Sequence, residues 1–389
     1  MKLKLSVFTL LFFFNYNFSQ QLQLSPQAEV SVLTFGPGTN LNDAFGHNAF
    51  RIKDRTQGLD VVYGYGGYDF EAPNFYLKFA QGKLNYLINR RKFSDIFQLY
   101  RYYDRTIDEQ TLNFSQSQKQ KLYNYLDNNY KPENRRYLYD FFYDNCATKI
   151  RDVANISANQ SIRFSEIKGE EKKTFRTLIH EQVGINTWGS FGIDIALGSI
   201  IDKQATDKEY MFLPKYIFKS FENAQIDSKP LVKGTNTIYK SRHNTGYKTN
   251  SIFNPIVILL LVSALIIYLT YRDYKSKKRT KWLDVILFSI TGIIGVMLLL
   301  LWFGTDHTAT GYNYNLLWAF PINLFVVRQL LKKQTKNWFR AYLKFLIIML
   351  ALMTMHWLIG IQFFAIALLP LLIALLIRYV YLLHYYKTA

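Results

Sequence analysis

The chain has 389 residues, a formal net charge of +19, 49% apolar residues and one cysteine. A single cysteine excludes an intramolecular disulfide. The positive charge does not indicate a nucleic-acid partner, because it is unevenly distributed. Residues 251–389 carry 14 Lys+Arg against 3 Asp+Glu, residues 21–250 carry 31 against 25, and Lys2 and Lys4 supply the rest.

Residues 1–20 have the pattern of a secretory signal peptide. Lys2 and Lys4 form a basic start, Leu5–Phe14 is apolar, and residues 17–20 form a plausible cleavage zone. The apolar stretch is short for a membrane span, which favours cleavage over retention as an anchor. We therefore predict that residues 21–250 are exported as a soluble domain followed by a linker.

Five long apolar runs follow residue 250, each near the ~20 residues that cross a bilayer. They are Ile252–Arg272, Trp282–Thr305, Asn315–Leu331, Tyr342–Ile359 and Phe363–Leu383. No soluble core needs five such runs in so short a segment. The sequence predicts that residues 251–389 form an all-α transmembrane domain of five helices.

The charges between these runs predict the orientation of the chain in the membrane. The loops after the first and third runs each carry six Lys or Arg residues, whereas Thr305–Tyr314 and the turn around Gly360 carry none. Basic loops stay in the cytoplasm. We expect a protein of the inner membrane with its soluble domain in the periplasm and its C-terminus in the cytoplasm.

The soluble half has an α+β pattern. Alternating residues predict strands at Glu29–Phe35, Phe45–Ile52, Asp60–Tyr65 and Lys83–Ile88, with a short helix at Phe75–Gly82. A further helix is predicted to begin at Ser115, with Gln118 in the capping-box position.

The only cysteine lies at a predicted helix start. Asp144 or Asn145 is a good N-cap, and Ile150 and Val153 recur at helical spacing, so Cys146 falls in the first turn. The helix dipole and free N–H groups there favour a thiolate and could stabilise an oxyanion. The alternative is a buried, inert core cysteine.

A catalytic cysteine needs a base, and the chain offers six histidines. His47 lies on a predicted strand behind a glycine, a rigid place from which to direct an imidazole. Of the others, His180 is predicted to be a surface residue of the helix Phe175–Gln182, His243 lies in the polar linker, and His356 and His384 lie in or at spans. A strand histidine followed by a helix-start cysteine favours a catalytic pair, against the alternative of a structural histidine.

This order of residues is similar to that of circularly permuted papain-like proteins, and Asn145-Cys146 resembles the Asn-Cys of lecithin–retinol acyltransferase-like enzymes. Over most of its length the chain resembles the lipoprotein N-acyltransferase family with an N-terminal periplasmic domain, of Bacteroides-type bacteria. The matching motifs are Gly46-His47, Val62-Tyr63-Gly64, Asp144-Asn145-Cys146, Phe191-Gly192-Ile193-Asp194, Leu197-Gly198, Asp202, Met211-Phe212-Leu213-Pro214, Asp306-His307, Asn313, Asn315-Leu316-Leu317-Trp318 and Pro321.

The resemblance implies a permuted papain-like domain that transfers an acyl chain from phospholipid to the lipidated N-terminal cysteine of apolipoproteins. It implies Cys146 as nucleophile and His47 as base, with no cofactor and no metal. Asp69 is a guess for a third member. Asn145, His307, Asn313 and Asn315 are predicted to contact substrate; the alternative for the loop of the last three is an interfacial connector.

Two other classes of function stay open. A cysteine peptidase or amidase acting on cell-wall peptides is the commoner chemistry of papain-like folds, although one anchor would serve it. A non-catalytic membrane receptor or scaffold would not need the thiol. Asp194 and Asp202 are expected to cap helices or to hold the soluble domain to the membrane part, and Met211–Pro214 to pack.

Overall fold

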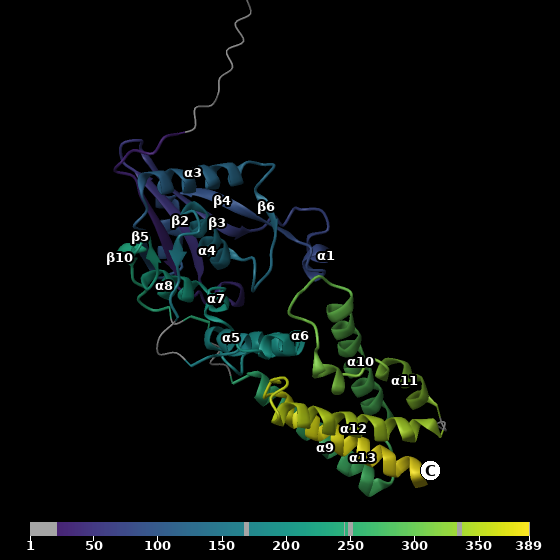
Figure 1. Ribbon diagram of the computed structural model, residues 1–389. Helices are drawn as coiled ribbons and strands as arrows, with labels where there is room; N and C mark the ends of the chain where they lie inside the picture. The colour runs from purple at the N-terminus through teal and green to yellow at the C-terminus, as the bar shows by residue number, and fades with distance from the viewer. Residues whose placement is uncertain (1–21, 167–170, 245, 248–251, 333–336, 389) are drawn as a thin grey trace, which may run out of the picture.

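The computed structural model describes residues 22–166, 171–244, 246–247, 252–332 and 337–388. An antiparallel sheet with its helices forms one part, and a set of long helices forms the other (Figure 1). The predicted signal peptide lies outside the described residues.

Seven strands make the main sheet, in the order β10-β5-β1-β2-β3-β4-β6. Every neighbouring pair is antiparallel. Their bounds are β1 Glu29–Phe35, β2 His47–Asp54, β3 Leu59–Gly67, β4 Asn85–Lys92, β5 Ile107–Leu112, β6 Arg136–Leu138 and β10 Val232–Tyr239. The four strands predicted from alternation are confirmed. The pairing partners β5 and β10 come from distant parts of the chain.

Both faces of this sheet are covered, because residues alternate between two cores. Phe50 and Ile52 of β2 pack with α3 (Gln116–Tyr130) and α4 (Cys146–Ser157). Ala49 of the same strand points to the opposite face and packs on the side of α2 (Phe93–Tyr102). The sheet is thus a rigid plate that fixes the position of the start of α4.

A helical layer joins the sheet domain to the membrane part. It contains η1 Leu41–Asp43, α5 Phe175–Val183, α6 Trp188–Ala196, η2 Ser199–Asp202, α7 Asp207–Tyr210 and α8 Pro214–Glu222, with a small sheet of β7 Ile162–Arg163, β8 Gln225–Ile226 and β9 Lys229–Pro230. Figure 1 shows α5 and α6 between the main sheet and the long helices. Met211–Pro214 is buried, as predicted for a packing segment.

Four of the described helices are long and apolar enough to cross a membrane. They are α9 Pro255–Ser276, α10 Lys281–Phe303, α12 Trp338–Leu358 and α13 Leu368–Thr388. Much of their surface is apolar and exposed, as expected of helices surrounded by lipid. These helices match four of the five predicted spans.

The third predicted span, Asn315–Leu331, is not one long helix. It consists of the short 3-10 helix η3 Tyr314–Leu317, a non-helical stretch through Pro321, and α11 Asn323–Leu331. The cause is local, since proline has no N–H to donate and clashes with the preceding turn of a helix. The described residues therefore contain four long helices and not the predicted five. The segment still runs along the bundle, because the carbonyls of Leu330 and Leu331 at its end accept hydrogen bonds from side chains at the start of α10.

Helix α10 packs closely against the non-helical stretch at two of its own glycines. A Cβ on Gly292 would lie 2.5 Å from the backbone nitrogen of Leu324, and one on Gly295 would lie 2.6 Å from that of Pro321. Asn323 donates to Thr291 on the same face. Irregular backbone at membrane depth is tolerated where protein covers it, and the glycines allow that close approach.

A buried charge cluster ties the end of the bundle that lies far from the sheet domain. Arg378 of α13 donates to Asp284 of α10 at 2.6 Å and to Asp273 of α9 at 2.8 Å. Arg279 lies 3.3 Å from the other oxygen of Asp284. Two cations thus balance two carboxylates, and the first, second and last long helices are held together.

Candidate active site

Cys146 is the first residue of α4, as predicted, and its half-buried thiol lies at the end of the helix that meets the sheet. The thiol accepts hydrogen bonds from the backbone N–H groups of Asn48, Ala147 and Cys146 itself. Asn48 directly follows His47 on β2. The nucleophile therefore sits beside the strand that carries the predicted base.

Asn145 is the N-cap of α4 and holds its first turn. Its side-chain oxygen accepts from the N–H groups of Ala147 and Thr148 at 2.8 and 2.9 Å, and its amide donates to the carbonyls of Phe141 and Phe212. All the hydrogen-bonding groups of this buried amide are engaged within the protein. Its position supports orientation of Cys146, and Asn145 also lines the cavity of Cys146, so its predicted substrate contact stays a prediction.

His47 lies at the start of β2, with its ring parallel to that of Phe35, the centroids 6.0 Å apart. Two glycines of β3 lie beside His47 and Cys146. A Cβ on Gly64 would lie 3.3 Å from His47 Nε2, and one on Gly66 would lie 3.9 Å from Cys146 Cβ. Positions two apart on a strand are separated by about 6.6 Å. The imidazole and the thiol therefore sit against neighbouring positions of one strand.

Burial determines the charge state of both groups. Burial, and to a smaller extent the nearby cation Arg105, together lower the pKa of His47 to about 4. Burial raises the pKa of the Cys146 thiol to about 11, although the three N–H groups and Arg105 oppose that rise. The desolvation of a charged group outweighs the helix N-terminus here. The resting pair is neutral, in contrast to the thiolate expected from the sequence.

One cavity of about 410 Å³ contains both His47 and Cys146. Most of its other walls are aromatic and come from distant segments. They include Phe45, Tyr65, Tyr68, Phe70, Phe75, Tyr76, Phe79, Tyr86, Tyr139, Phe141 and Phe212. Such a lining suits an apolar substrate and excludes water from the thiol.

A second cavity of about 440 Å³ adjoins the first and extends towards the membrane domain. The two share Phe45, Phe79, Tyr86, Tyr139 and Phe141 as lining residues. The far wall of the second cavity is the loop after α10, which contributes Asp306, His307, Thr308 and Ala309. His307 lines this second cavity, and its contact with a substrate stays a prediction, whereas Cys146 lines the first cavity only.

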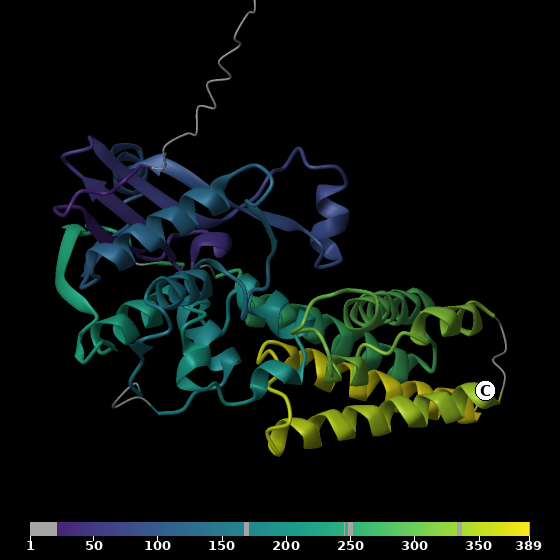
Figure 2. The ribbon, with the colours of Figure 1, turned by 45° about the horizontal axis from the view of Figure 1, so that its top comes forward.

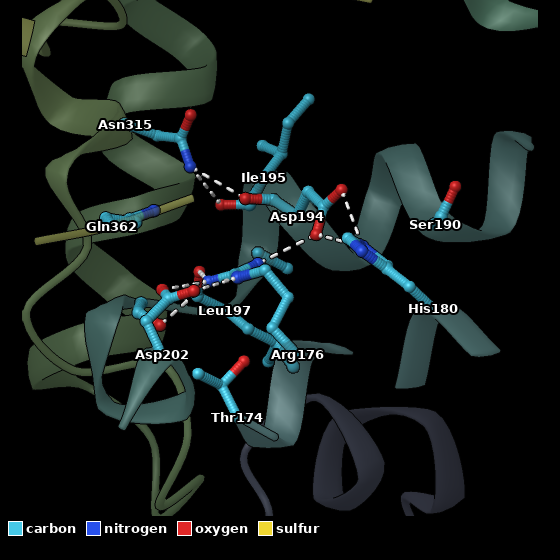
Figure 3. A network of polar contacts seen from close by, with 12 residues as sticks. Thr174, Arg176, His180, Ser190, Asp194, Ile195, Leu197, Asp202, Asn315 and Gln362 are labelled. Carbon is cyan, nitrogen blue, oxygen red and sulfur yellow. Dashed lines mark hydrogen bonds and ion pairs between the residues drawn. The ribbon is translucent and has the colours of Figure 1, made fainter. Parts of the chain in front are cut away.

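Asn313 and Asn315 serve the joint between the two parts of the protein, and Figure 3 shows Asn315 beside Asp194 and Ile195. Asn313 donates to the carbonyls of Ile195 and Ala196, and Asn315 donates to those of Asp194 and Ile195. Both side chains are buried, and neither lines the cavities described above. They connect the membrane domain to the C-terminal end of α6, and their predicted contact with substrate stays a prediction.

The joint centres on a buried arginine that the sequence analysis did not single out. Arg176 donates to Asp194 at 2.8 Å and to Asp202 at 2.8 and 3.0 Å (Figure 3). His180 is also bound there: its Nε2 lies 2.9 Å from Asp194, and it is buried. The prediction of His180 as a surface residue is wrong, because a neighbouring helix covers it. Asp194 and Asp202 hold the joint, one of the two roles expected of them.

Two smaller expectations concern additional groups at the site. The carboxylate of Asp69 accepts from the N–H of Glu71 in its own loop, and Asp69 does not line the cavity of His47. Within the described ranges, no cluster of three or more His, Cys, Asp or Glu residues is arranged to hold a metal ion. The site consists of a thiol, an imidazole, backbone donors and aromatic walls.

The fold and site define an integral membrane protein whose soluble domain carries a cysteine–histidine cavity facing the membrane part. Two family models match the chain: the Lnb N-terminal periplasmic domain over residues 16–181 and the Lnb transmembrane domain over residues 247–389. The chain thus has the domain layout of the Lnb family, a membrane-spanning domain preceded by a periplasmic one. Neither the curated proteins nor the solved structures gave a match.

Proposed function

We propose that the protein is an apolipoprotein N-acyltransferase of the inner membrane, with a permuted papain-like catalytic domain. It transfers an acyl chain from phospholipid, through a thioester on Cys146, to the α-amine of a lipidated N-terminal cysteine. The observation that carries the proposal is the shared aromatic cavity of Cys146 and His47, with its neighbour reaching the membrane domain. The C-terminus would lie in the cytoplasm, in agreement with the basic loops.

In the first step, neutral His47 accepts the proton of the Cys146 thiol as the sulfur attacks the ester carbonyl of a phospholipid. The ester C–O bond breaks, and His47 returns the proton to the leaving alcohol. The products are an acyl thioester on Cys146 and a lysophospholipid. The lowered pKa keeps His47 neutral at physiological pH, so a ring nitrogen is free to accept the proton, and it also makes the imidazole a weaker base than an exposed histidine.

The developing oxyanion needs donors, and the backbone offers them. The N–H groups of Asn48 and Cys146 face the thiol, and Arg105 adds positive charge nearby. Ala147 N–H is shared with the Asn145 cap. Preorganised donors of this kind stabilise charge that develops in a transition state.

In the second step, the free amine of the acceptor attacks the thioester. His47 accepts a proton from the nitrogen, the C–S bond breaks, and the thiol is regenerated as the amide forms. Both substrates are amphiphiles of the membrane, which accounts for a catalytic domain joined to several spans. Aromatic walls limit competing hydrolysis of the thioester.

The experiment is intact-protein mass spectrometry of the purified protein after incubation with phospholipid. We expect a hydroxylamine-labile acyl adduct and an equivalent amount of lysophospholipid. The Cys146→Ala variant should give neither, and the His47→Gln variant should form the adduct orders of magnitude more slowly. Absence of both products in the wild type would contradict the proposal.

A further measurement separates this proposal from a peptidase or amidase. Addition of a synthetic diacylglyceryl-cysteine peptide should discharge the adduct and add one acyl mass to the peptide. A peptidase would shorten a peptide and leave phospholipid intact. A scaffold would be indifferent to Cys146→Ala in both assays.

A further inference from the structure

The segment Tyr68–Ala80, which ends in the short helix α1 Phe75–Ala80, exposes an unusual concentration of apolar side chains. Tyr76 is 78% exposed and Phe70 63%, and Tyr68, Leu77 and Phe79 are also exposed. Transfer of such side chains from water to an apolar environment is favourable. A contiguous exposed patch of this kind marks an interaction surface.

Helix α1 lies next to the loop that follows the membrane-spanning helix α10. Gln81, the residue after α1, accepts a hydrogen bond from the N–H of Asp306 at 2.8 Å. A Cβ on Gly82 would lie 3.0 Å from the backbone nitrogen of His307. Since α10 ends at Phe303, α1 lies at the end of a membrane-spanning helix, as Figures 1 and 2 show. This is the level at which the hydrocarbon region gives way to headgroups.

The same segment also lines the cavity of Cys146. Tyr68, Phe70, Phe75, Tyr76 and Phe79 contribute to its wall, whereas Leu77 does not. Four of the five exposed side chains of the segment therefore also line the thiol cavity, and Leu77 lies outside it. Side chains that are both exposed and part of the cavity wall place the segment at the opening of the cavity.

We propose that Tyr68–Ala80 rests in the headgroup region of the outer leaflet and forms the lipid-side mouth of the Cys146 cavity. Exposed tyrosines and phenylalanines suit this region, where aromatic side chains are enriched. An element of this type sinks about 5–10 Å into the boundary. The bilayer is favoured over a second copy or a peptide because the segment ends against the loop that follows α10, and the last residue of α10, Phe303, is itself an exposed apolar side chain. The role as a mouth for acyl chains rests on the proposed function; the membrane contact does not.

The test relies on the chain having one cysteine, so that its replacement leaves a background in which a single new cysteine can be labelled. In a Cys146→Ser background, which has no other cysteine, a nitroxide is attached at Leu77→Cys or, as control, at Tyr125→Cys. Tyr125 lies on α3, at the end of the sheet domain away from the membrane helices (Figure 1). Each protein is reconstituted in nanodiscs of phosphatidylethanolamine and phosphatidylglycerol, and collision of the label with oxygen and with a water-soluble nickel chelate is measured by EPR.

We expect the label at residue 77 to favour oxygen over nickel and the label at residue 125 to favour nickel. Equal behaviour of the two sites would overturn the proposal and place α1 in water. Shielding of residue 77 from both reagents would also overturn it, because it would indicate a protein partner. These outcomes do not depend on enzyme activity.

A second measurement addresses passage of the acyl chain. Leu77→Glu should slow formation of the Cys146 adduct from phospholipid vesicles about tenfold, through the lost burial of one apolar side chain, and Leu77→Met should not. With a short-chain ester dissolved in water, Leu77→Glu should form the adduct as fast as the wild type. An equal loss of rate with both donors would refute the role of Tyr68–Ala80 as a mouth for acyl chains. If the wild type forms no adduct with either donor, the proposed function fails while the EPR result still decides the membrane contact.

Discussion

At the scale of single residues, burial controls the chemistry of the site more than the helix terminus does. The helix start and the N-cap are local features, and the sequence predicts them. The pKa of Cys146 depends on aromatic walls contributed by residues far away in the chain, such as Phe45 and Phe212. Local sequence carries no measure of that desolvation, which is why a thiolate was expected where the structure favours a thiol.

Alkylation of Cys146 should report the raised pKa. Because the thiolate is the reactive form, the rate with iodoacetamide should rise about tenfold per pH unit from pH 7 to 10 for a thiol with a pKa of about 11. A thiol with the ordinary value of 9.0 would approach a plateau within that range. A plateau below pH 8 would contradict the neutral resting pair.

The decrease in the rate of adduct formation at low pH should reveal the pKa of His47. A base acts in its neutral form, which persists above its pKa, so function is lost as the pH falls through that value. With the pKa lowered to about 4, single-turnover adduct formation should be retained at pH 5 and fall with a midpoint near 4. A midpoint near 6.5, the value of an exposed histidine, would show that the imidazole is solvated during the reaction.

At the scale of elements, periodicity and turn residues predict the four strands β1 to β4, α1 and the start of α3. They do not predict which distant segments pair, as β5 and β10 do. The third crossing is a different case: its composition is apolar enough for a span, but Pro321 interrupts the helix and two glycines of a neighbouring helix cover the gap. Composition measures affinity for lipid, whereas continuity of the helix depends on single residues.

The close approach of α10 to this crossing predicts the effect of added side chains. Gly292→Ala should lower the thermal unfolding temperature in detergent, because its methyl group has no space next to Leu324. Gly192→Ala on α6 is the matched control: no atom lies within 4 Å of its Cβ, and alanine favours a helix by about 1 kcal/mol over glycine. Equal unfolding temperatures for the two variants would contradict the packing described here.

The joint around Arg176 should be sensitive to loss of one partner. Arg176→Met leaves Asp194 and Asp202 buried without their cation, which costs about 3–5 kcal/mol, and the unfolding temperature of the sheet domain should fall accordingly. Lys215→Met removes a partly exposed pair with Glu181 and should cost no more than about 1 kcal/mol. Comparable losses for the two variants would show that the joint contributes little.

At the scale of the whole molecule, the order of domains and the membrane character follow from the sequence. Charge and hydropathy are sums over many residues, so predictions made from them are little affected by local irregularities such as the interrupted helix in Asn315–Leu331. The contact between the domains does not follow, because it depends on single amides such as Asn313 and Asn315 that meet backbone carbonyls of α6. For that reason the bonds that these residues make in the joint were not predicted from the sequence.

The predicted orientation can be tested in cells with permeabilised outer membranes. In the Cys146→Ser background, Leu358→Cys and Tyr274→Cys place exposed thiols at opposite ends of the bundle. A membrane-impermeant maleimide should label residue 358 and should label residue 274 only after lysis. The reverse pattern would place the C-terminus outside the cytoplasm.

The charge cluster of Arg378 also bears on how the protein is made. Asp273 and Asp284 belong to the first two long helices, whereas Arg378 belongs to the last, so synthesis from the N-terminus delivers the carboxylates long before their main cation. Until α13 arrives, Asp284 has Arg279 as its cation and Asp273 has only the partly exposed Arg272 at 3.9 Å, so the first helix hairpin is incompletely assembled. A ribosome that stops early therefore leaves a product with uncompensated charge in the membrane, a signature by which proteolytic quality control can distinguish unfinished chains from complete ones.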